Sequence, residues 1–455
     1  WTRITSGIAA SEFTRVVRED PTRAGLLYAG TERGVWVSFD DGAHWQRLQK
    51  NLPPVPVHDL ALKEGDLIAA THGRGFWILD DLSTLRQYAA GLTEREFHLY
   101  TPRDAYRTTF GGFFFGPGGA GGPAAATGLP PLSGWDGAVI NYWLKKPGQK
   151  VMLEFLDAKG QLIRRFASEQ DSTARADSLR QADERASRDS VNRRKADSLA
   201  ALGVLPAAIR SDTSDTRVPV GGWRYTPPPR APARAGMNRF SWNLRAEDAQ
   251  GFTGMIFWAG GTFGPVIPPG TYTVRVTAGE QSETQTFHVL KDPRGNATQA
   301  DLDAQYSFAI QVRDKTTEAN NAVRTIRNLK AQLADRRAKA GNRAAPLEKL
   351  ASSLEAQLSS VEEEIYQVKN RSGQDPLNYP IRLNNQLAAL AGVVASAEAR
   401  PTAQTYEVFK LLSAQLDTQL KRLNELLSSG LAGVNAELTR LGLEKITPST
   451  AELQR

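Results

Sequence analysis

A stretch near the start of the chain occurs twice, and this repeat constrains the fold more than any other feature. The first copy covers residues 27–38 and the second residues 67–78. Trp36 matches Trp77 after a one-residue insertion, so the offset is 40 to 41 residues. An offset of this size is the period of a propeller blade, which is one four-stranded sheet per repeat. We therefore predict two similar sheets, with two short strands and a tight glycine turn in each copy.

A third strand is predicted between the two copies, over residues 55–62. Val55 and Val57 would share one face of it, and Leu60 and Leu62 the other. The alternation slips by one residue near Asp59.

The first copy ends in a turn that contains Ser38, Asp40, Gly42 and Trp45. We expect the Asp40 carboxylate to accept backbone N–H bonds, and Gly42 to adopt a positive φ. Trp45 would pack against the sheet. The pattern resembles the Asp-box, whose turns lie on a propeller rim away from the ligand site, so structural roles are expected for these four residues and for Asp41.

The segment 71–82 resembles the last blade of bacterial sortilin/VPS10-like Asp-box (BNR-repeat) β-propeller proteins, often labelled glycosyl hydrolases. The resemblance implies the C-terminal portion of a larger extracytoplasmic protein, which is periplasmic, cell-surface or secreted. The remaining blades would lie upstream of Trp1 or come from another chain. His72 and Arg74 are candidate ligand-binding residues at the propeller mouth, with a plain turn role as the alternative.

The expected fold class is multidomain β plus α. Its parts are the last blades of an Asp-box β-propeller, a Gly/Phe-rich linker, an Ig-like antiparallel β-sandwich with a charged insertion, and a C-terminal antiparallel helical bundle. Their predicted bounds are 1–91, 92–136, 137–291 with the insertion at 168–217, and 292–455.

The sandwich is predicted from short apolar runs separated by turn residues. The runs are 138–144, 150–156, 162–166, 238–244, 269–276 and 284–289. Residues 236–242 and 269–272 are similar to the Ig-like module of the same proteins. Two glycine-rich segments also carry aromatic residues. We interpret 111–123 as a linker, with a partner surface as the alternative. We interpret 251–265 as a plug between sandwich and propeller, with sugar stacking as the alternative.

Helices are predicted over about 299–340, 346–369 and 380–397, with Thr298 and Asp301 at the first N-terminus. A fourth begins after Pro401 and carries an apolar stripe at helical spacing, which predicts a bundle seam. The stripe consists of Val408, Leu411, Leu412, Leu416, Leu420, Leu423, Leu427, Leu431, Val434, Leu438 and Leu441.

Catalytic chemistry is not visible in the sequence, and the catalytic residues stay unknown. The absence of cysteine excludes disulfides, thiolate zinc sites and cysteine nucleophiles. The histidines form no metal-ligand motif, so we expect no metal and no cofactor. A glycosidase needs two carboxylates on one cleft. Glu32, Asp59, Asp80 and Asp81 lie in the repeats, but nothing in the sequence pairs them.

Charge and hydropathy restrict the partners. The net charge is +7, but acidic and basic residues are interspersed, so we expect no nucleic-acid partner. No apolar run has the ~20 residues of a membrane helix, so no transmembrane segment is expected. Two functions stay open. One is a binding or scaffolding protein that grips a polypeptide or glycan and can form an oligomer. The other is a glycoside hydrolase whose catalytic carboxylates lie in blades upstream of this chain.

Overall fold

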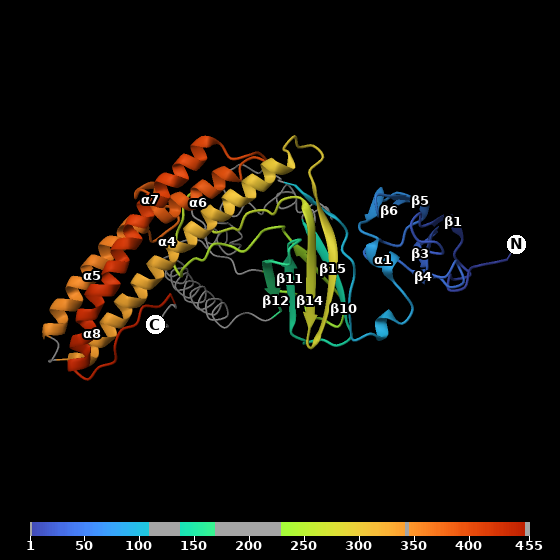
Figure 1. Ribbon diagram of the computed structural model, residues 1–455. Coiled ribbons are helices and arrows are strands. Elements are labelled where there is room, and N and C mark those ends of the chain that lie inside the picture. The colour runs from blue at the N-terminus through green and yellow to red at the C-terminus, as the bar shows by residue number, and fades with distance from the viewer. Residues whose placement is uncertain (1, 109–136, 169–228, 342–344, 451–455) are drawn as a thin grey trace, which may run out of the picture.

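The computed structural model describes residues 2–108, 137–168, 229–341 and 345–450. Figure 1 shows three parts in a row: small sheets at the N-terminal end, larger sheets in the middle and long helices at the other end. The protein is therefore multidomain, with β-structure followed by α-structure. The glycine-rich segment 111–123 and residues 169–217 of the predicted insertion lie outside the described residues.

The N-terminal part contains two antiparallel sheets, ordered β1-β2-β3-β4 and β5-β6-β7. Their apolar side chains form one shared core between the sheets. A short helix, α1 (Ser83–Gln87), follows the second sheet. The strands are β1 (Thr14–Glu19), β2 (Leu27–Thr31), β3 (Gly34–Ser38), β4 (Gln46–Arg47), β5 (Val57–Lys63), β6 (Asp66–Thr71) and β7 (Phe76–Leu79).

The slip predicted near Asp59 is a register shift in β5 between Val57 and Asp59. The expected separation of Val57 and Leu60 onto opposite faces is wrong. Both are buried in the shared core, with Leu62 packed against it. A bulge inserts one extra residue into a strand, so two residues three apart point to the same side.

The middle part consists of a sheet of three strands, β13-β10-β8, and a sheet of five, β12-β11-β14-β15-β9. One core joins them, and within it Trp242 stacks on Phe155 with 4.1 Å between ring centroids. Alternate residues of β14, namely Tyr272, Val274 and Val276, face this core as predicted. The strands are β8 (Phe97–Leu99), β9 (Ala105–Arg107), β10 (Ala138–Leu144), β11 (Val151–Leu156), β12 (Leu162–Ala167), β13 (Gly236–Trp242), β14 (Gly270–Ala278) and β15 (Gln281–Lys291).

Part of the predicted linker belongs to these sheets. The sequence predicts irregular chain over 92–136, but β8 pairs with β10, and β9 pairs with β15 in parallel. A three-residue strand has too short a pattern to be recognised from sequence, and here tertiary pairing determines it.

The C-terminal part is helical. α4 begins with a capping box in which Thr298 and Asp301 bond each other's backbone N–H groups, as the sequence predicts. The predicted fourth helix continues through a π-helical turn, η6, at 426–430. The helices are α4 (Gln299–Ala340), α5 (Ala345–Ile365), α6 (Leu383–Val394), α7 (Ala403–Glu425) and α8 (Leu431–Arg440).

The apolar stripe of the last helix is only partly a seam. Leu412 and Leu416 are buried in the helical core, and so are Leu423, Leu431, Val434 and Leu438. Val408 and Leu411, however, are 43% and 58% exposed. Tyr406 and Phe409 of the same turns pack on Phe308 of α4, whereas Val408 and Leu411 face away from it. Which face of α7 is covered is a property of helix placement that the spacing does not contain.

The second aromatic segment packs elsewhere than predicted. Phe252, Met255 and Phe257 enter the helical core, not a seam with the N-terminal sheets. Asn385 on α6 fixes this loop, because its amide donates to the Trp258 carbonyl and accepts from the Trp258 N–H, both at 2.7 Å. The neighbouring Asn384 donates to Asn320 on α4 at 2.9 Å. The amides of this region thus join the loop to the helices.

Candidate binding surfaces

The two repeats have the same strand register. Tyr28 pairs with Val37 in the first sheet, and Ile68 pairs with Ile78 at the equivalent place in the second. Both copies also have a register shift at the same point of the preceding strand. The copies are therefore equivalent three-stranded units, and their faces can be compared residue by residue.

Each sheet presents two faces to its surroundings. In the first sheet, Tyr28, Val35 and Val37 point toward the second sheet, and we call this the forward face. The opposite, backward face has Leu27, Ala29 and Trp36, which form a core with Trp45 and Ile8.

In the second sheet the backward face has Leu67, Ala69 and Trp77, which pack against the forward face of the first sheet. The two repeats thus pack head to tail. The forward face of the second sheet consists of the equivalent residues Ile68, Phe76 and Ile78.

This forward face of the second sheet is open in the part of the chain that the structure describes. Phe76 is 78% exposed and Ile78 is 57% exposed. Their equivalents Val35 and Val37 are each only 3% exposed. β7 is also the last strand of its sheet, so its outer backbone edge has no partner strand among the described residues. Contiguous exposed apolar side chains of this kind mark interaction surfaces.

The turn after β3 is held by local hydrogen bonds. The Ser38 hydroxyl donates to Asp40 at 2.8 Å and accepts from the Gly42 N–H at 2.9 Å. The His44 N–H donates to Asp40 at 2.9 Å, and Gly42 has a φ of 85°. Trp45 is buried, and its indole N–H donates to the Ile4 carbonyl at 2.8 Å. Through these contacts the turn is held by four of its own residues, namely Ser38, Asp40, Gly42 and Trp45.

Hydrogen bonds also set the acidity of Asp40. Donation from the backbone and side chain of His44, followed by the Ser38 hydroxyl, lowers the pKa of Asp40 to about 2. A carboxylate this acidic is ionised at neutral pH and is no proton donor there. Asp40 itself is therefore not a general acid at neutral pH.

His72 and Arg74 lie in the β6–β7 turn, and both are exposed. The His72 N–H donates to the Pro56 carbonyl at 2.9 Å, and the Arg74 carbonyl accepts from the Trp77 indole at 3.2 Å. The structure also brings the His58 ring to 5.2 Å from the His72 ring, between centroids. Sequence reasoning missed this neighbour, because the bulge of β5 determines which way His58 points.

The candidate carboxylates are separately engaged. Glu32 binds Arg15 and Asp59 binds Arg18, each at 2.6 Å. Asp81 accepts the Ser83 N–H at 3.1 Å. These partners hold three of the four candidate acids in local structural contacts, and no such contact is found for Asp80 among the described residues.

Neither a metal cluster nor a membrane helix is found among the described residues. They contain no group of three or more His, Asp or Glu side chains arranged to hold a metal ion. None of their helices combines the length and the apolar character needed to cross a membrane.

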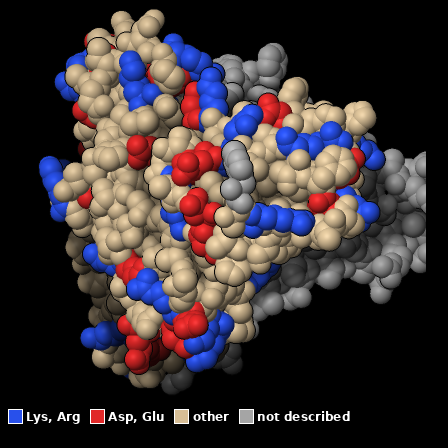
Figure 2. All heavy atoms as spheres, turned by 90° about the vertical axis from the view of Figure 1, so that its right-hand side faces the viewer, with Lys and Arg blue, Asp and Glu red and all other residues tan. Residues whose placement is uncertain are grey.

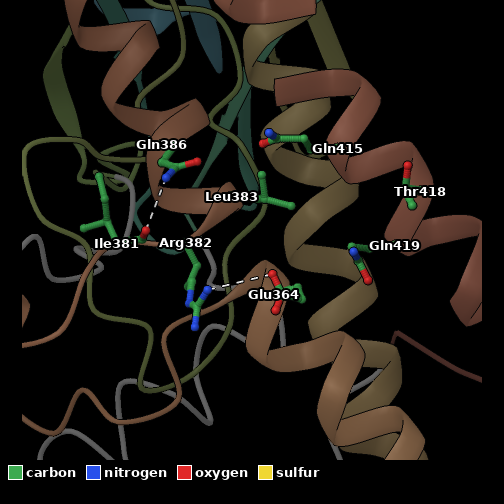
Figure 3. A pocket seen from close by; sticks show the side chains of 8 residues that line it. All are labelled: Glu364, Ile381, Arg382, Leu383, Gln386, Gln415, Thr418 and Gln419. Atoms are coloured by element: carbon green, nitrogen blue, oxygen red, sulfur yellow. Dashed lines mark hydrogen bonds and ion pairs between the residues drawn. The ribbon is translucent and has the colours of Figure 1, made fainter. Parts of the chain in front are cut away.

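An open groove of about 390 Å³ lies where α5, the start of α6 and α7 meet. Figure 3 shows Arg382 and Glu364 pointing toward each other in it, 3.8 Å apart, and Gln415 on the facing helix. The lining residues are Glu364, Ile381, Arg382, Leu383, Gln386, Gln415, Thr418 and Gln419. Amide and hydroxyl groups both donate and accept, which suits hydroxyl or peptide groups of a ligand.

The surface charge is mixed. Figure 2 shows Lys and Arg side chains interspersed with Asp and Glu over the end of the molecule that carries the N-terminal sheets. No single-sign field covers this face.

Comparison with known proteins gives no relative from which a function follows. No family model matches the chain, and neither a curated protein nor a solved structure matches it.

Proposed function

We propose that this chain is part of an extracytoplasmic binding or scaffolding protein of the sortilin-like Asp-box propeller type, which grips a polypeptide or glycan. Its two N-terminal sheets are blades of one propeller. The middle sheets are an Ig-like sandwich, and the C-terminal helices are an antiparallel bundle that braces the propeller or mediates assembly.

One observation carries the proposal: the open forward face of the second sheet. The forward face of the first sheet is covered by the backward face of the second sheet, which presents Leu67, Ala69 and Trp77. By the same relation, a further repeat with small and large apolar residues on its backward face would cover Phe76 and Ile78. Head-to-tail interfaces of this kind close into a ring when the rotation between neighbours permits it.

The middle and C-terminal assignments have supporting contacts of their own. Two mainly antiparallel sheets share one core, as in a sandwich. α4 contacts α5, α6 and α7, and residues from all the long helices enter a single core.

Chemical labelling tests the propeller. The chain has no cysteine, so Ile78→Cys places a single thiol on the open face. We expect fast thiol labelling in the 455-residue chain and slow labelling once further repeats of the same protein are joined to it or added. Leu162→Cys, at a 49% exposed position of the middle part, is the control and should label equally in both. Equal labelling of Ile78→Cys in both forms would argue against further blades.

Ligand panels test the activity. The protein with its full set of repeats is applied to arrays of glycans and unfolded polypeptides, and the same preparations are assayed for reducing sugar. Retention of a ligand without sugar release supports binding. Sugar release that is lost on changing an upstream Asp or Glu to Ala supports the hydrolase, and failure on all panels contradicts both.

A further inference from the structure

A second cavity, of about 190 Å³, lies between the loop that follows β13 and helices α4 and α6. Its wall is mainly apolar and includes Phe263, Val266, Ala309 and Ala391. Gly260 brings the loop against α6, because a Cβ there would lie 2.6 Å from the Ala388 carbonyl carbon. Small-molecule sites are typically concave, mostly apolar and located between packed units.

Three arginines also line this cavity, and two of them have a carboxylate partner. Arg107 donates to Glu398 at 2.6 Å, to Gln305 at 2.8 Å and to the Ile267 carbonyl at 3.0 Å. Arg313 donates to Asp314 at 2.7 Å and to the Glu247 carbonyl at 2.9 Å.

The third arginine, Arg245, has no counter-ion among the residues that the structure describes. Its guanidinium donates to the Gly264 carbonyl at 2.9 Å, and no carboxylate of the described residues lies within ion-pair distance. Asp248 is the acid whose charge acts on Arg245. Its carboxylate, however, already accepts hydrogen bonds from Arg164 at 3.0 and 2.7 Å. Arg245 is thus a partly buried cation whose neighbouring acid already has a partner.

The electrostatic surroundings of Arg245 favour an anion. Burial lowers the pKa of Arg245, and the charges of Arg164 and Arg107 act in the same direction, whereas Asp248 opposes them. A guanidinium nevertheless stays charged in proteins. A desolvated charge without a partner is unfavourable, so an anion in the cavity would lower the free energy.

A second donor that lines the cavity comes from α4. Tyr306 is half-buried and lines the wall, and no hydrogen bond of its hydroxyl is found among the described residues. Burial raises the pKa of Tyr306, so the phenol keeps its proton at neutral pH and can donate it.

We propose that this cavity binds a small organic carboxylate. Its head accepts hydrogen bonds from Arg245 and Tyr306, and its apolar body lies against Phe263 and Val266. The combination of one unpaired guanidinium with apolar walls favours such a ligand over two other classes. Inorganic anions have no apolar surface to pack against the walls, and neutral amides form no ion pair with the guanidinium. This site is separate from the N-terminal sheets and does not depend on the propeller.

Calorimetric titration of the 455-residue chain tests the proposal with benzoate, benzamide and inorganic phosphate as probes. We expect saturable binding of benzoate and much weaker binding of the other two. Because hydrogen bonds to a charged group are the strong ones, Arg245→Gln should weaken benzoate binding at least about tenfold.

Two further variants keep the test decisive if Arg245→Gln folds poorly. Gly392 lines the cavity, and within 4 Å of its Cβ position lies only the Ala259 carbonyl, at 3.8 Å, so Gly392→Leu should fold and obstruct the cavity. Arg239→Gln, at an exposed position of β13, removes the same charge outside the cavity and should bind benzoate normally. Absent benzoate binding, equal binding of benzamide or phosphate, or benzoate affinity unchanged in Gly392→Leu would overturn the proposal.

Discussion

Arg107 on β9 donates to Glu398, in the connection between α6 and α7, across 2.6 Å. Their side chains are only 3% and 12% exposed. A second Arg107 N–H donates to Gln305 on α4. A three-residue strand thus links the five-stranded sheet to the helical part at two points.

Removing one partner of this buried pair should be costly. Glu398→Ala leaves the Arg107 charge without its carboxylate, which typically costs about 3–5 kcal/mol of unfolding free energy. Chemical denaturation of the purified chain measures the loss. Arg400→Ala is the matched control, because its pair with Asp301 is exposed and should contribute less than about 1 kcal/mol. Similar losses in both variants would contradict the structural role assigned to Arg107.

The two halves of the α7 stripe should respond differently to truncation. Leu416 is fully buried in the helical core, so Leu416→Ala should cost about 2–5 kcal/mol through lost burial and a residual cavity. Leu411 is 58% exposed, and Leu411→Ala should change stability by no more than about 0.5 kcal/mol. Denaturant unfolding of the two variants provides the measurement, and equal costs would show that another surface covers Leu411.

The amide of Asn385 should be important for the Gly/aromatic loop. Asn385→Ala leaves the N–H and the carbonyl of Trp258 without partners, at a cost of about 2–4 kcal/mol. We also expect faster amide hydrogen exchange over residues 251–265. Gln386→Ala serves as control, since its amide makes a single longer bond of 3.3 Å. Unchanged exchange in Asn385→Ala would mean that packing of Phe252 and Phe257 alone holds the loop.

The turn after β3 should depend on pH through Asp40. Its pKa falls from the ordinary 3.8 to about 2 in the folded protein, mainly because the backbone and side chain of His44 donate to it. A depressed folded-state pKa stabilises the fold above the unfolded value, and this stabilisation is lost as pH falls from 3.8 toward 2. The Asp40→Asn variant has no carboxylate at this position, so it has no such stabilisation to lose as the pH falls.

The measurement compares the denaturation midpoints of wild type and Asp40→Asn at about pH 5 and about pH 3. We expect the difference between the two proteins to be larger at the higher pH. A difference that stays constant, or grows on acidification, would show that the Asp40 charge does not stabilise the turn.

Several elements could be predicted from sequence because local patterns determine them. Strand β10 has the predicted bounds, and α4 begins at the Thr298 capping box and ends at Gly341, also as predicted. In each case the alternation or spacing of apolar residues and the end signals agree with each other. The repeat likewise predicts two equivalent hairpins, and both are present with one register.

The candidate binding surfaces could not be predicted from local sequence patterns in the same way. The nearness of His58 and His72 depends on a bulge, and the exposure of Leu411 depends on which face of α7 packs on α4. Arg245 carries no sequence signal, because an unpaired arginine becomes visible only when every nearby acid has been located.

By itself, therefore, the sequence determined the type and the approximate limits of most strands and helices, since hydrogen bonding and side-chain periodicity act over a few neighbouring residues. Only the tertiary structure decided which faces are covered, that the 251–265 loop enters the helical core, and that Arg245 has no counter-ion in the described part of the chain. Those properties come from contacts between residues far apart in the chain, such as Arg107 and Glu398, and no local pattern encodes such distances.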